Sequence, residues 1–274
     1  MQNNILHPSR RGLLKSLGAA AALAGFQVGV HQPLWAQSAC TILGSPSLTE
    51  GPYFADEDLN RTDIRIDPSD GTMQEGLPLA MSINISKLVN CVTAPMAGAY
   101  VDIWHCSAAG VYSDMAAQNS TGKKYLRGYQ PTDRHGNVYF TTVYPGWYQG
   151  RAVHIHAKIR VFDGESKSYE FTSQFFFDDS FSDDVYKAGV YAKNRARDTR
   201  NTNDGIYGGA SSSGTAITRD SGSYLMLALR NKGSYVEADA KLICDISLGS
   251  TPNDTPGGPG GPGPGGPGPG GPRP

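Results

Sequence analysis

The feature that most constrains the fold of this sequence is the run from Val153 to Val161, which reads V-H-I-H-A-K-I-R-V. Every odd-numbered residue of the run is apolar, and every even-numbered residue is polar or basic. Because successive side chains of a β-strand point to opposite faces, this alternation predicts a strand with one face buried in a core. His154 and His156 then share the opposite face, about 6.5–7 Å apart along the strand.

Other segments of the chain are also typical of short strands, and clusters of Gly, Pro, Asn and Asp separate them. Strands are predicted over Pro78–Ile85, Ala97–Trp104, Asn137–Val143, Tyr169–Phe177, Ser223–Leu229 and Val236–Ile246. Residues Asp183–Asn194 allow one short helix, and Asn201–Ser213 are expected to form a polar loop. Many short strands with little helix indicate an all-β fold, a single-domain β-sandwich of mixed or antiparallel strands with long loops.

Residues 1–39 are typical of an export signal. A twin-arginine pattern, Ser9–Lys15, is followed by an apolar stretch rich in Ala and Gly, Leu17–Val30, and by the small-residue motif Leu34–Ala36. The alternative is a membrane anchor, but the apolar run is shorter than the roughly 20 residues of a spanning helix. We expect export by the twin-arginine route to the periplasm or the medium, with no membrane attachment after cleavage.

The other end of the chain, residues 251–274, consists almost entirely of Pro and Gly. Such a segment has nothing to bury that would offset its ordering entropy, so we expect a disordered tail, with surface attachment as the alternative. Residues 40–250 remain, a usual length for one all-β domain. The formal net charge of −1 and the lack of a basic block give no indication of a nucleic acid or an anionic membrane as partner.

The chain has four cysteines, Cys40, Cys91, Cys106 and Cys244. Because their number is even and an export signal is expected, two disulfides are favoured over free thiols. Three pairings are open. Because Cys91 and Cys106 flank one predicted strand and Cys40 and Cys244 would tie the two ends together, we expect the pairs Cys91–Cys106 and Cys40–Cys244. Metal binding by these cysteines is the alternative, but no CxxC motif occurs.

A tyrosine and an arginine precede the histidine pair. The segment Pro145–Arg151 reads P-G-W-Y-Q-G-R, a turn that brings Tyr148 and Arg151 beside His154 and His156. A phenolate oxygen suits a hard trivalent cation, whereas softer ions prefer thiolate and imidazole. A His-x-His pair alone is weak evidence, because surface and core histidines show the same spacing. No glutamate lies close by to complete a ferrous site of two histidines and one carboxylate.

Three sequence motifs extend this pattern. They are Thr49-Glu50-Gly51-Pro52-Tyr53-Phe54, then Gly98-Ala99-x-Val101-x-Ile103-Trp104-His105 with Gly110-x-Tyr112-Ser113, and finally Gly136-x-Val138-x-Phe140-x-Thr142-x-x-Pro145-Gly146-x-Tyr148-x-x-Arg151-x-x-His154-Ile155-His156. In this order they resemble the motifs of the intradiol ring-cleavage dioxygenase family, the group that contains the catechol 1,2- and protocatechuate 3,4-dioxygenases. With the export signal, the chain resembles an exported twin-arginine subgroup of that family.

The resemblance implies a non-haem Fe(III) centre. Tyr112 and Tyr148 would be the phenolate ligands, and His154 and His156 the imidazole ligands; the motif, not the composition, selects these two from 14 tyrosines. The implied reaction uses O2 to cut a catechol-type ring between its two hydroxylated carbons, giving a cis,cis-muconate-type dicarboxylic acid.

The resemblance also implies roles for residues near the metal. Tyr148 would leave the iron and take up a proton when substrate binds, and Arg151 would stabilise negative charge that develops on the ring. Gln174 falls where the family carries a glutamine beside the ligands. Tyr53 and Trp147 are candidates for the wall of the substrate pocket, although either could equally belong to the core.

Some features depart from the better-known members. Only two residues separate Tyr148 from Arg151, and no long helical N-terminal dimerisation segment is present. We therefore expect a more open site that accepts substrates larger than catechol. The identity of the catechol and a homo-oligomeric state stay open. His105 and His135 lack a partner at ligand spacing and are predicted to be structural.

Two other functions compete with this prediction. A non-catalytic β-sandwich binding module, for carbohydrate or cell wall, would suit the export signal and the tail, but it needs none of the site residues together. A zinc hydrolase would use the histidine pair, but it requires a carboxylate or a third histidine nearby and has no use for two tyrosines.

Overall fold

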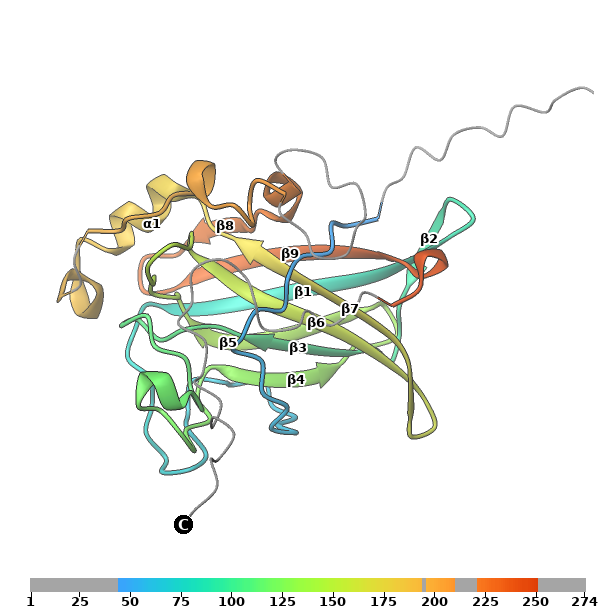
Figure 1. Ribbon diagram of the computed structural model, residues 1–274, viewed down its shortest axis with the longest axis horizontal. Coiled ribbons are helices and arrows are strands. Elements are labelled where there is room, and N and C mark those ends of the chain that lie inside the picture. Colours follow the sequence, from blue (N-terminus) through green and yellow to red (C-terminus); the bar gives the residue numbers. More distant parts are fainter. Residues whose placement is uncertain (1–43, 194–195, 210–220, 251–274) are drawn as a thin grey trace, which may run out of the picture. The chain divides into compact units, whose positions relative to one another are not determined.

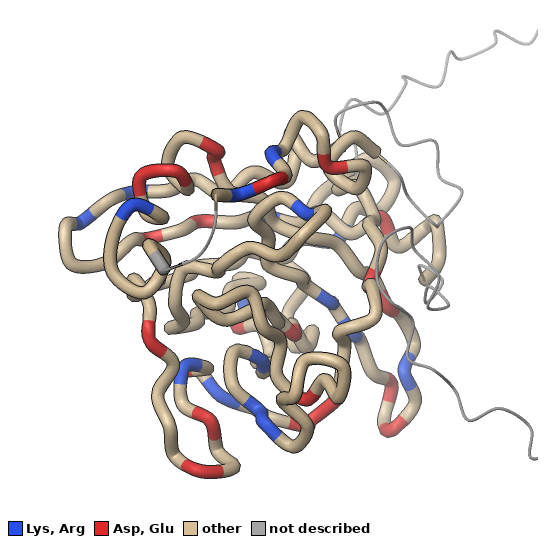
Figure 2. Tube along the Cα trace, turned by 60° about the vertical axis from the view of Figure 1, so that its left-hand side comes forward, with Lys and Arg blue, Asp and Glu red and all other residues tan. Residues whose placement is uncertain are grey.

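The computed structural model describes residues 44–193, 196–209 and 221–250. The predicted export signal (1–39), Cys40 and the predicted tail (251–274) lie outside the described residues. Within these ranges no helix has the length and the apolar character needed to cross a membrane. Figure 2 shows Lys and Arg interspersed with Asp and Glu along the chain.

Two β-sheets form the body of the domain (Figure 1). The described residues contain nine strands: β1 (Pro78–Val89), β2 (Val92–Pro95), β3 (Tyr100–Trp104), β4 (Arg127–Pro131), β5 (Asn137–Val143), β6 (His154–Asp163), β7 (Ser166–Phe176), β8 (Ala228–Asn231) and β9 (Val236–Asp245). One sheet has the order β2-β1-β9-β8, with β5 also paired to β1, and the other has the order β4-β3-β6-β7. Strands β1 and β9 are parallel, whereas the strands of the second sheet are antiparallel. The predicted all-β sandwich of mixed strands is confirmed.

Alternating apolar residues of the two sheets form the core between them. Ile83 and Ile85 of β1 face this core, as do Ile155 and Ile159 of β6, and each is fully buried. Burying an aliphatic side chain of this size contributes about 1.5–3 kcal/mol relative to leaving it exposed. The alternation of β6 therefore places its apolar face as the sequence predicts.

The boundaries of some elements differ from the prediction. Strands β2 and β4 were not predicted, because they are short and contain Pro or Gly. Residues Ser221–Leu225 form a 3-10 helix, so β8 begins later than the predicted Ser223–Leu229. The helix α1 spans Asp179–Val185 instead of Asp183–Asn194, because the side chain of Asp178 caps its N-terminus.

The other face of the four-stranded sheet is covered by residues 44–61, called here the covering segment, which crosses β6 and β7 in Figure 1. Leu48 N donates to Thr172 O at 3.0 Å, and Tyr129 N donates to Leu59 O at 2.8 Å. His154 and His156 consequently have only 3% and 1% of their surface exposed. The sequence placed the histidines opposite the buried face of β6, whereas in the structure both faces are buried.

The predicted disulfide pairs Cys91–Cys106 and Cys40–Cys244 are wrong, because Cys106 and Cys244 are free, buried thiols. Cys106 lies beyond the end of β3, inside the aromatic cluster that contains Tyr112. Cys91 lies in the exposed turn between β1 and β2, with a φ of 63°, and is disulfide-bonded. Cys40 lies outside the described residues. Flanking a strand in sequence therefore did not bring Cys91 and Cys106 together.

Candidate metal centre

A row of side chains crosses the four-stranded sheet at the level of the histidine pair. Arg127 on β4 is paired with Trp104 on β3, Trp104 with His156 on β6, and His156 with Gln174 on β7. Directly paired residues of antiparallel strands project to the same face. The Trp104 ring stacks on the His156 imidazole, with centroids 4.7 Å apart and planes 9° apart. The sheet thus sets both the height and the plane of this imidazole.

The first residue of β6, His154, is held by the backbone just before the strand. Its Nδ1 lies 2.7 Å from the carbonyl oxygen of Ala152, to which only an Nδ1–H can donate. This contact leaves the lone pair on Nε2. Nε2 of His156 lies 3.1 Å from Nε2 of His154, so the two strand neighbours converge on one point.

Tyr112 and Tyr148 come from two loops, after β3 and after β5, whose backbones are in close contact. A Cβ atom on Gly110 would lie 2.2 Å from a carbonyl oxygen of the Tyr148 loop. A Cβ atom on Gly146 would lie 2.4 Å from a carbonyl oxygen of the loop that follows β3. Only glycine permits this approach at both positions, and it brings the two phenol rings to a centroid separation of 5.6 Å.

Four polar atoms converge on Nε2 of His154. The hydroxyl of Tyr148 lies at 3.2 Å, that of Tyr112 at 3.4 Å, Nε2 of His156 at 3.1 Å and Nη1 of Arg151 at 3.4 Å. A single imidazole lone pair cannot accept hydrogen bonds from all of them. The structure therefore brings together the two tyrosines and two histidines that the sequence predicted as metal ligands.

Burial keeps the four side chains of this cluster in their neutral forms. Burial, with a contribution from the Arg151 charge, lowers the pKa of His154 and of His156 well below the usual range. Burial raises the pKa of Tyr112 well above its usual value and that of Tyr148 to about 12, although Arg151 opposes the rise at both. The imidazoles are thus neutral donors, and the phenols would ionise near neutral pH only beside a strong positive charge.

The chemistry of this donor set fits ferric iron, because phenol oxygens are hard ligands and imidazole binds iron well. No group of three or more His, Cys, Asp or Glu side chains that could hold a metal occurs in the described part of the chain. A site with two tyrosine donors needs no such group.

Arg151 is fixed by two side chains from distant parts of the chain. Its Nη2 donates to Gln174 Oε1 at 2.6 Å, and its Nε donates to Asp204 Oδ2 at 3.0 Å. Gln174 in turn donates to the carbonyl oxygen of Thr49 at 2.7 Å. Sequence reasoning assigned no role to Asp204, because an Asp-Gly pair in a polar loop indicates only a turn.

The covering segment lies directly over the cluster. Tyr53, a predicted pocket residue, stacks on Tyr112 with ring centroids 4.3 Å apart. Gly51, with a φ of 68°, approaches so closely that a Cβ atom would lie 3.6 Å from His156 Cε1. Trp147, the other predicted pocket residue, is buried in the core between the sheets and not in the aromatic cluster around Tyr112.

Two buried cations, neither of them predicted, hold the covering segment in place. Lys158, on the same face of β6 as the histidines, forms ion pairs with Glu50 and Glu170 and lies 3.8 Å from the centre of the Phe54 ring. Arg127 donates to Tyr53 O at 3.3 Å and to the carbonyl oxygen of Ser113, next to Tyr112, at 2.6 Å. The only sequence signal for Lys158 was its place in the β6 alternation.

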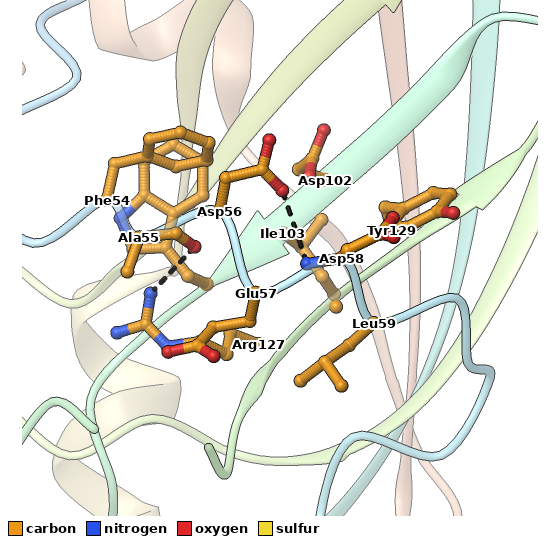
Figure 3. A pocket seen from close by; sticks show the side chains of 12 residues that line it. Phe54, Ala55, Asp56, Glu57, Asp58, Leu59, Asp102, Ile103, Arg127 and Tyr129 are labelled. Atoms are coloured by element: carbon orange, nitrogen blue, oxygen red, sulfur yellow. Dashed lines mark hydrogen bonds between the residues drawn. The ribbon is translucent and has the colours of Figure 1, made fainter. Parts of the chain in front are cut away.

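A small pocket lies beside the donor cluster, between the covering segment and strands β3 and β4 (Figure 3). It is lined by Phe54, Ala55, Asp56, Glu57, Asp58, Leu59, Asp102, Ile103, Trp104, Arg127, Gly128 and Tyr129. Figure 3 shows the hydrogen bond that Arg127 donates to the carbonyl oxygen of Ala55. The pocket shares Trp104 with the row of paired side chains that crosses the sheet, but none of the four predicted ligands lines it.

His105 has a structural role, as predicted. Its Nδ1 donates to Cys106 O at 2.8 Å, and its Nε2 lies 2.7 Å from the hydroxyl of Thr142 on β5. The buried imidazole therefore has both nitrogens satisfied. His135, the other histidine near the motifs, is exposed in the turn before β5 and accepts from Arg134 Nε at 2.8 Å.

Comparison with known proteins identifies the family. The model of the Dioxygenase family (Dioxygenase_C) matches residues 49–205. The structure of an intradiol ring-cleavage dioxygenase from Tetranychus urticae is 26% identical, with a TM-score of 0.61, over 74% of this chain and 95% of that chain. The dioxygenase domain of a dioxygenase carbohydrate-binding protein fusion from Streptomyces sp. SirexAA-E is 23% identical, with a TM-score of 0.50, over 74% and 99%, and shows the same fold. A search of the curated proteins finds no match.

The matched region contains all four residues of the donor cluster, together with Arg151, Gln174 and Asp204. Since the family model matches more than half of the chain, this protein belongs to the Dioxygenase family.

Proposed function

We propose that this protein is an intradiol ring-cleavage dioxygenase that binds non-haem Fe(III) through Tyr112, Tyr148, His154 and His156. The observation that carries the proposal is the convergence of the two phenol oxygens and His156 Nε2 within 3.4 Å of His154 Nε2. The similarity to the Tetranychus urticae intradiol enzyme supports the same reaction class. The overall reaction would convert a catechol-type aromatic and O2 to a cis,cis-muconate-type dicarboxylic acid.

Bound iron would act as a Lewis acid that makes a catechol hydroxyl easier to deprotonate. Among the protein's own phenols, Tyr148 is the one that can move away from the cluster and take up a proton, because it is partly exposed whereas Tyr112 is fully buried. Arg151 Nη1 lies 3.5 Å from the Tyr148 hydroxyl, where its charge favours the phenolate until the proton arrives. The same guanidinium would stabilise negative charge on the substrate ring.

The surroundings of the cluster exclude water on most sides. The sheet lies beneath it, with Trp104 against His156, and Tyr53 of the covering segment lies against Tyr112. A dry site strengthens each electrostatic interaction with the substrate. We further propose that the protein acts after export by the twin-arginine route, on the basis of residues 1–39 alone.

The test is iron content, visible absorption and O2 uptake with a panel of catechols of increasing size, using purified full-length protein. We expect one iron per chain, a red-brown colour from phenolate-to-iron charge transfer, and O2 uptake with at least one catechol. Tyr148→Phe should change the colour and abolish most activity. The matched control Tyr139→Phe, at a tyrosine that is 55% exposed on β5, should change neither.

A colourless iron-loaded protein would contradict the proposal, and so would a Tyr148→Phe variant with unchanged colour and turnover. Folded protein that binds no iron and consumes no O2 with any catechol would favour the non-catalytic binding module instead.

A further inference from the structure

Asp204 is a fully buried carboxylate that contacts two separate parts of the candidate site. It follows the 3-10 helix η3 (Asn201–Asn203), in a loop far from β6 in sequence. Its Oδ2 accepts from Arg151 Nε at 3.0 Å and from the backbone N of Ala152 at 2.7 Å. Its Oδ1 accepts from the backbone N of Ile206 at 2.7 Å, which fixes the carboxylate within its own loop.

The first contact determines where the Arg151 guanidinium points. Nε is held by Asp204, and Nη2 is held by Gln174 at 2.6 Å. Because the guanidinium is planar and rigid, two fixed nitrogens also fix the third. Nη1 is therefore directed at the donor cluster, 3.5 Å from the Tyr148 hydroxyl and 3.4 Å from His154 Nε2.

The second contact reaches the histidine side of the site. The peptide unit of Ala152 donates its N–H to Asp204, and the carbonyl oxygen of Ala152 accepts from His154 Nδ1 at 2.7 Å. A carboxylate that holds this residue therefore also holds the group that sets the tautomer of His154. A single buried carboxylate thus connects the arginine and a histidine of the cluster.

The charge of Asp204 is needed as well as its shape. The side chain of Arg151 is 17% exposed and that of Asp204 is 0% exposed, so the two charges are withdrawn from water together. An arginine in this position without a carboxylate would lack compensation for its desolvation. It would also be free to turn toward solvent, away from the donor cluster.

We propose that Asp204 is a positioning residue, which orients the Arg151 guanidinium toward the substrate and fixes the Nδ1–H tautomer of His154 through Ala152. The inference rests on the proposed function for its catalytic consequence. Its structural part, the orientation of two side chains, is independent of iron and of substrate.

The test compares wild type, Asp204→Asn, Asp204→Ala and the control Asp198→Asn as full-length proteins. Asp198 is an exposed aspartate of the same loop that accepts from Gly150 N at 3.3 Å. Displacement of a group that positions substrate costs about 100-fold in rate. We expect Asp204→Ala to lose about 100-fold in kcat with a smaller change in KM. Asp204→Asn, whose one oxygen can serve only one of the two sets of donors, should fall between Asp204→Ala and wild type, and Asp198→Asn should match wild type.

A second readout uses metal-free protein labelled with 15N. In wild type we expect a slowly exchanging Arg151 Nε–H signal and His154 in the Nδ1–H tautomer. We expect the exchange of the Arg151 Nε–H to be fastest in Asp204→Ala and intermediate in Asp204→Asn. If Asp204→Ala does not fold, the Asn variant decides both readouts. A folded Asp204→Asn variant with wild-type kcat, KM and Arg151 exchange would overturn the inference. If wild type itself consumes no O2 with any catechol, the proposed function fails, whereas the exchange measurement still tests the orientation of Arg151.

Discussion

The ring of Tyr53 stacks on the ring of Tyr112, with centroids 4.3 Å apart and planes 18° apart. Tyr53 also meets Tyr148 edge to face, so one side chain of the covering segment contacts both tyrosines of the site. We expect Tyr53→Ala to lower the free energy of unfolding by at least the roughly 0.5–1.5 kcal/mol of an aromatic pair and to speed the loss of iron to a chelator.

Tyr53→Phe keeps the ring and should retain wild-type stability and iron retention. Tyr224→Ala, at a tyrosine that is 69% exposed, is the matched control for the loss of a ring. Urea unfolding and the rate of bleaching by a chelator measure both effects. Equal bleaching rates for Tyr53→Ala and wild type would contradict a covering role for Tyr53.

A substitution at Gly146 tests the contact between the loops that carry Tyr112 and Tyr148. A Cβ atom there would lie 2.4 Å from one backbone carbonyl oxygen and 2.5 Å from another, so Gly146→Ala must push the loops apart. We expect a loss of about 1–3 kcal/mol in the free energy of unfolding and weaker iron binding. Gly205→Ala meets no atom within 4 Å and is the control, with an expected change within about 0.5 kcal/mol. Iron titration and urea unfolding would show whether the two glycines differ.

A substitution at Lys158 tests the ion pairs that this residue forms with Glu50 and Glu170 under the covering segment. Its side chain is 3% exposed, and it compensates Glu50 and Glu170, which are 15% and 4% exposed. Lys158→Met leaves the half-buried Glu50 without its cation and the buried Glu170 with Lys167 alone, so we expect a loss of about 3–5 kcal/mol in the free energy of unfolding. The combined change Lys158→Met with Glu50→Leu should recover part of that loss. Lys187→Met removes an exposed pair with Asp184 and should leave the urea midpoint unchanged.

His105 provides a pH dependence from a buried histidine that is not one of the predicted metal ligands. Burial lowers its pKa from 6.5 to about 4, so the folded protein resists protonation of a group that the unfolded chain protonates readily. Its contribution to stability is therefore fully present above pH 6.5 and is lost as pH falls toward 4, in total about 3 kcal/mol. Urea unfolding of metal-free wild type and His105→Asn between pH 7 and 5 should give a steeper decline for wild type. Parallel curves would contradict this assignment.

Removal of the metal should lower the melting temperature, because a ligand that binds only the folded state stabilises it, by about 2.7 kcal/mol at 100 times its dissociation constant. We expect re-addition of Fe(III) to restore the melting temperature of wild type. His156→Ala, which lacks one predicted ligand, should show no such response. A melting temperature that is indifferent to iron in wild type would argue against a specific iron site.

The sequence predicted the fold class and part of the site, namely His154, His156 and Tyr148, because both depend on local backbone geometry. The alternation from Val153 to Val161 fixes which side chains of β6 face the core, and it places His154 and His156 on one face whatever surrounds them. Tyr148 follows from the short turn before this strand. Tyr112 could be selected only by its motif, since no local pattern distinguishes it from the other tyrosines.

Other features depend on which distant segments come to lie side by side. Cys91 and Cys106 flank β3 in sequence, yet the structure places Cys106 in the buried aromatic cluster and Cys91 in an exposed turn. The covering segment buries the second face of β6, which alternation alone left open to solvent. Asp204 reaches Arg151 across 53 residues of chain.

What the sequence determined by itself was therefore the β-sandwich, the histidine pair and the candidate metal ligands. Only the tertiary structure decided that the site is closed by residues 44–61, which cysteines are free, and that Asp204 holds Arg151. The physical reason is that side-chain direction along a strand is a property of neighbouring residues, whereas burial and ion pairing depend on the packing of loops that sequence order does not specify.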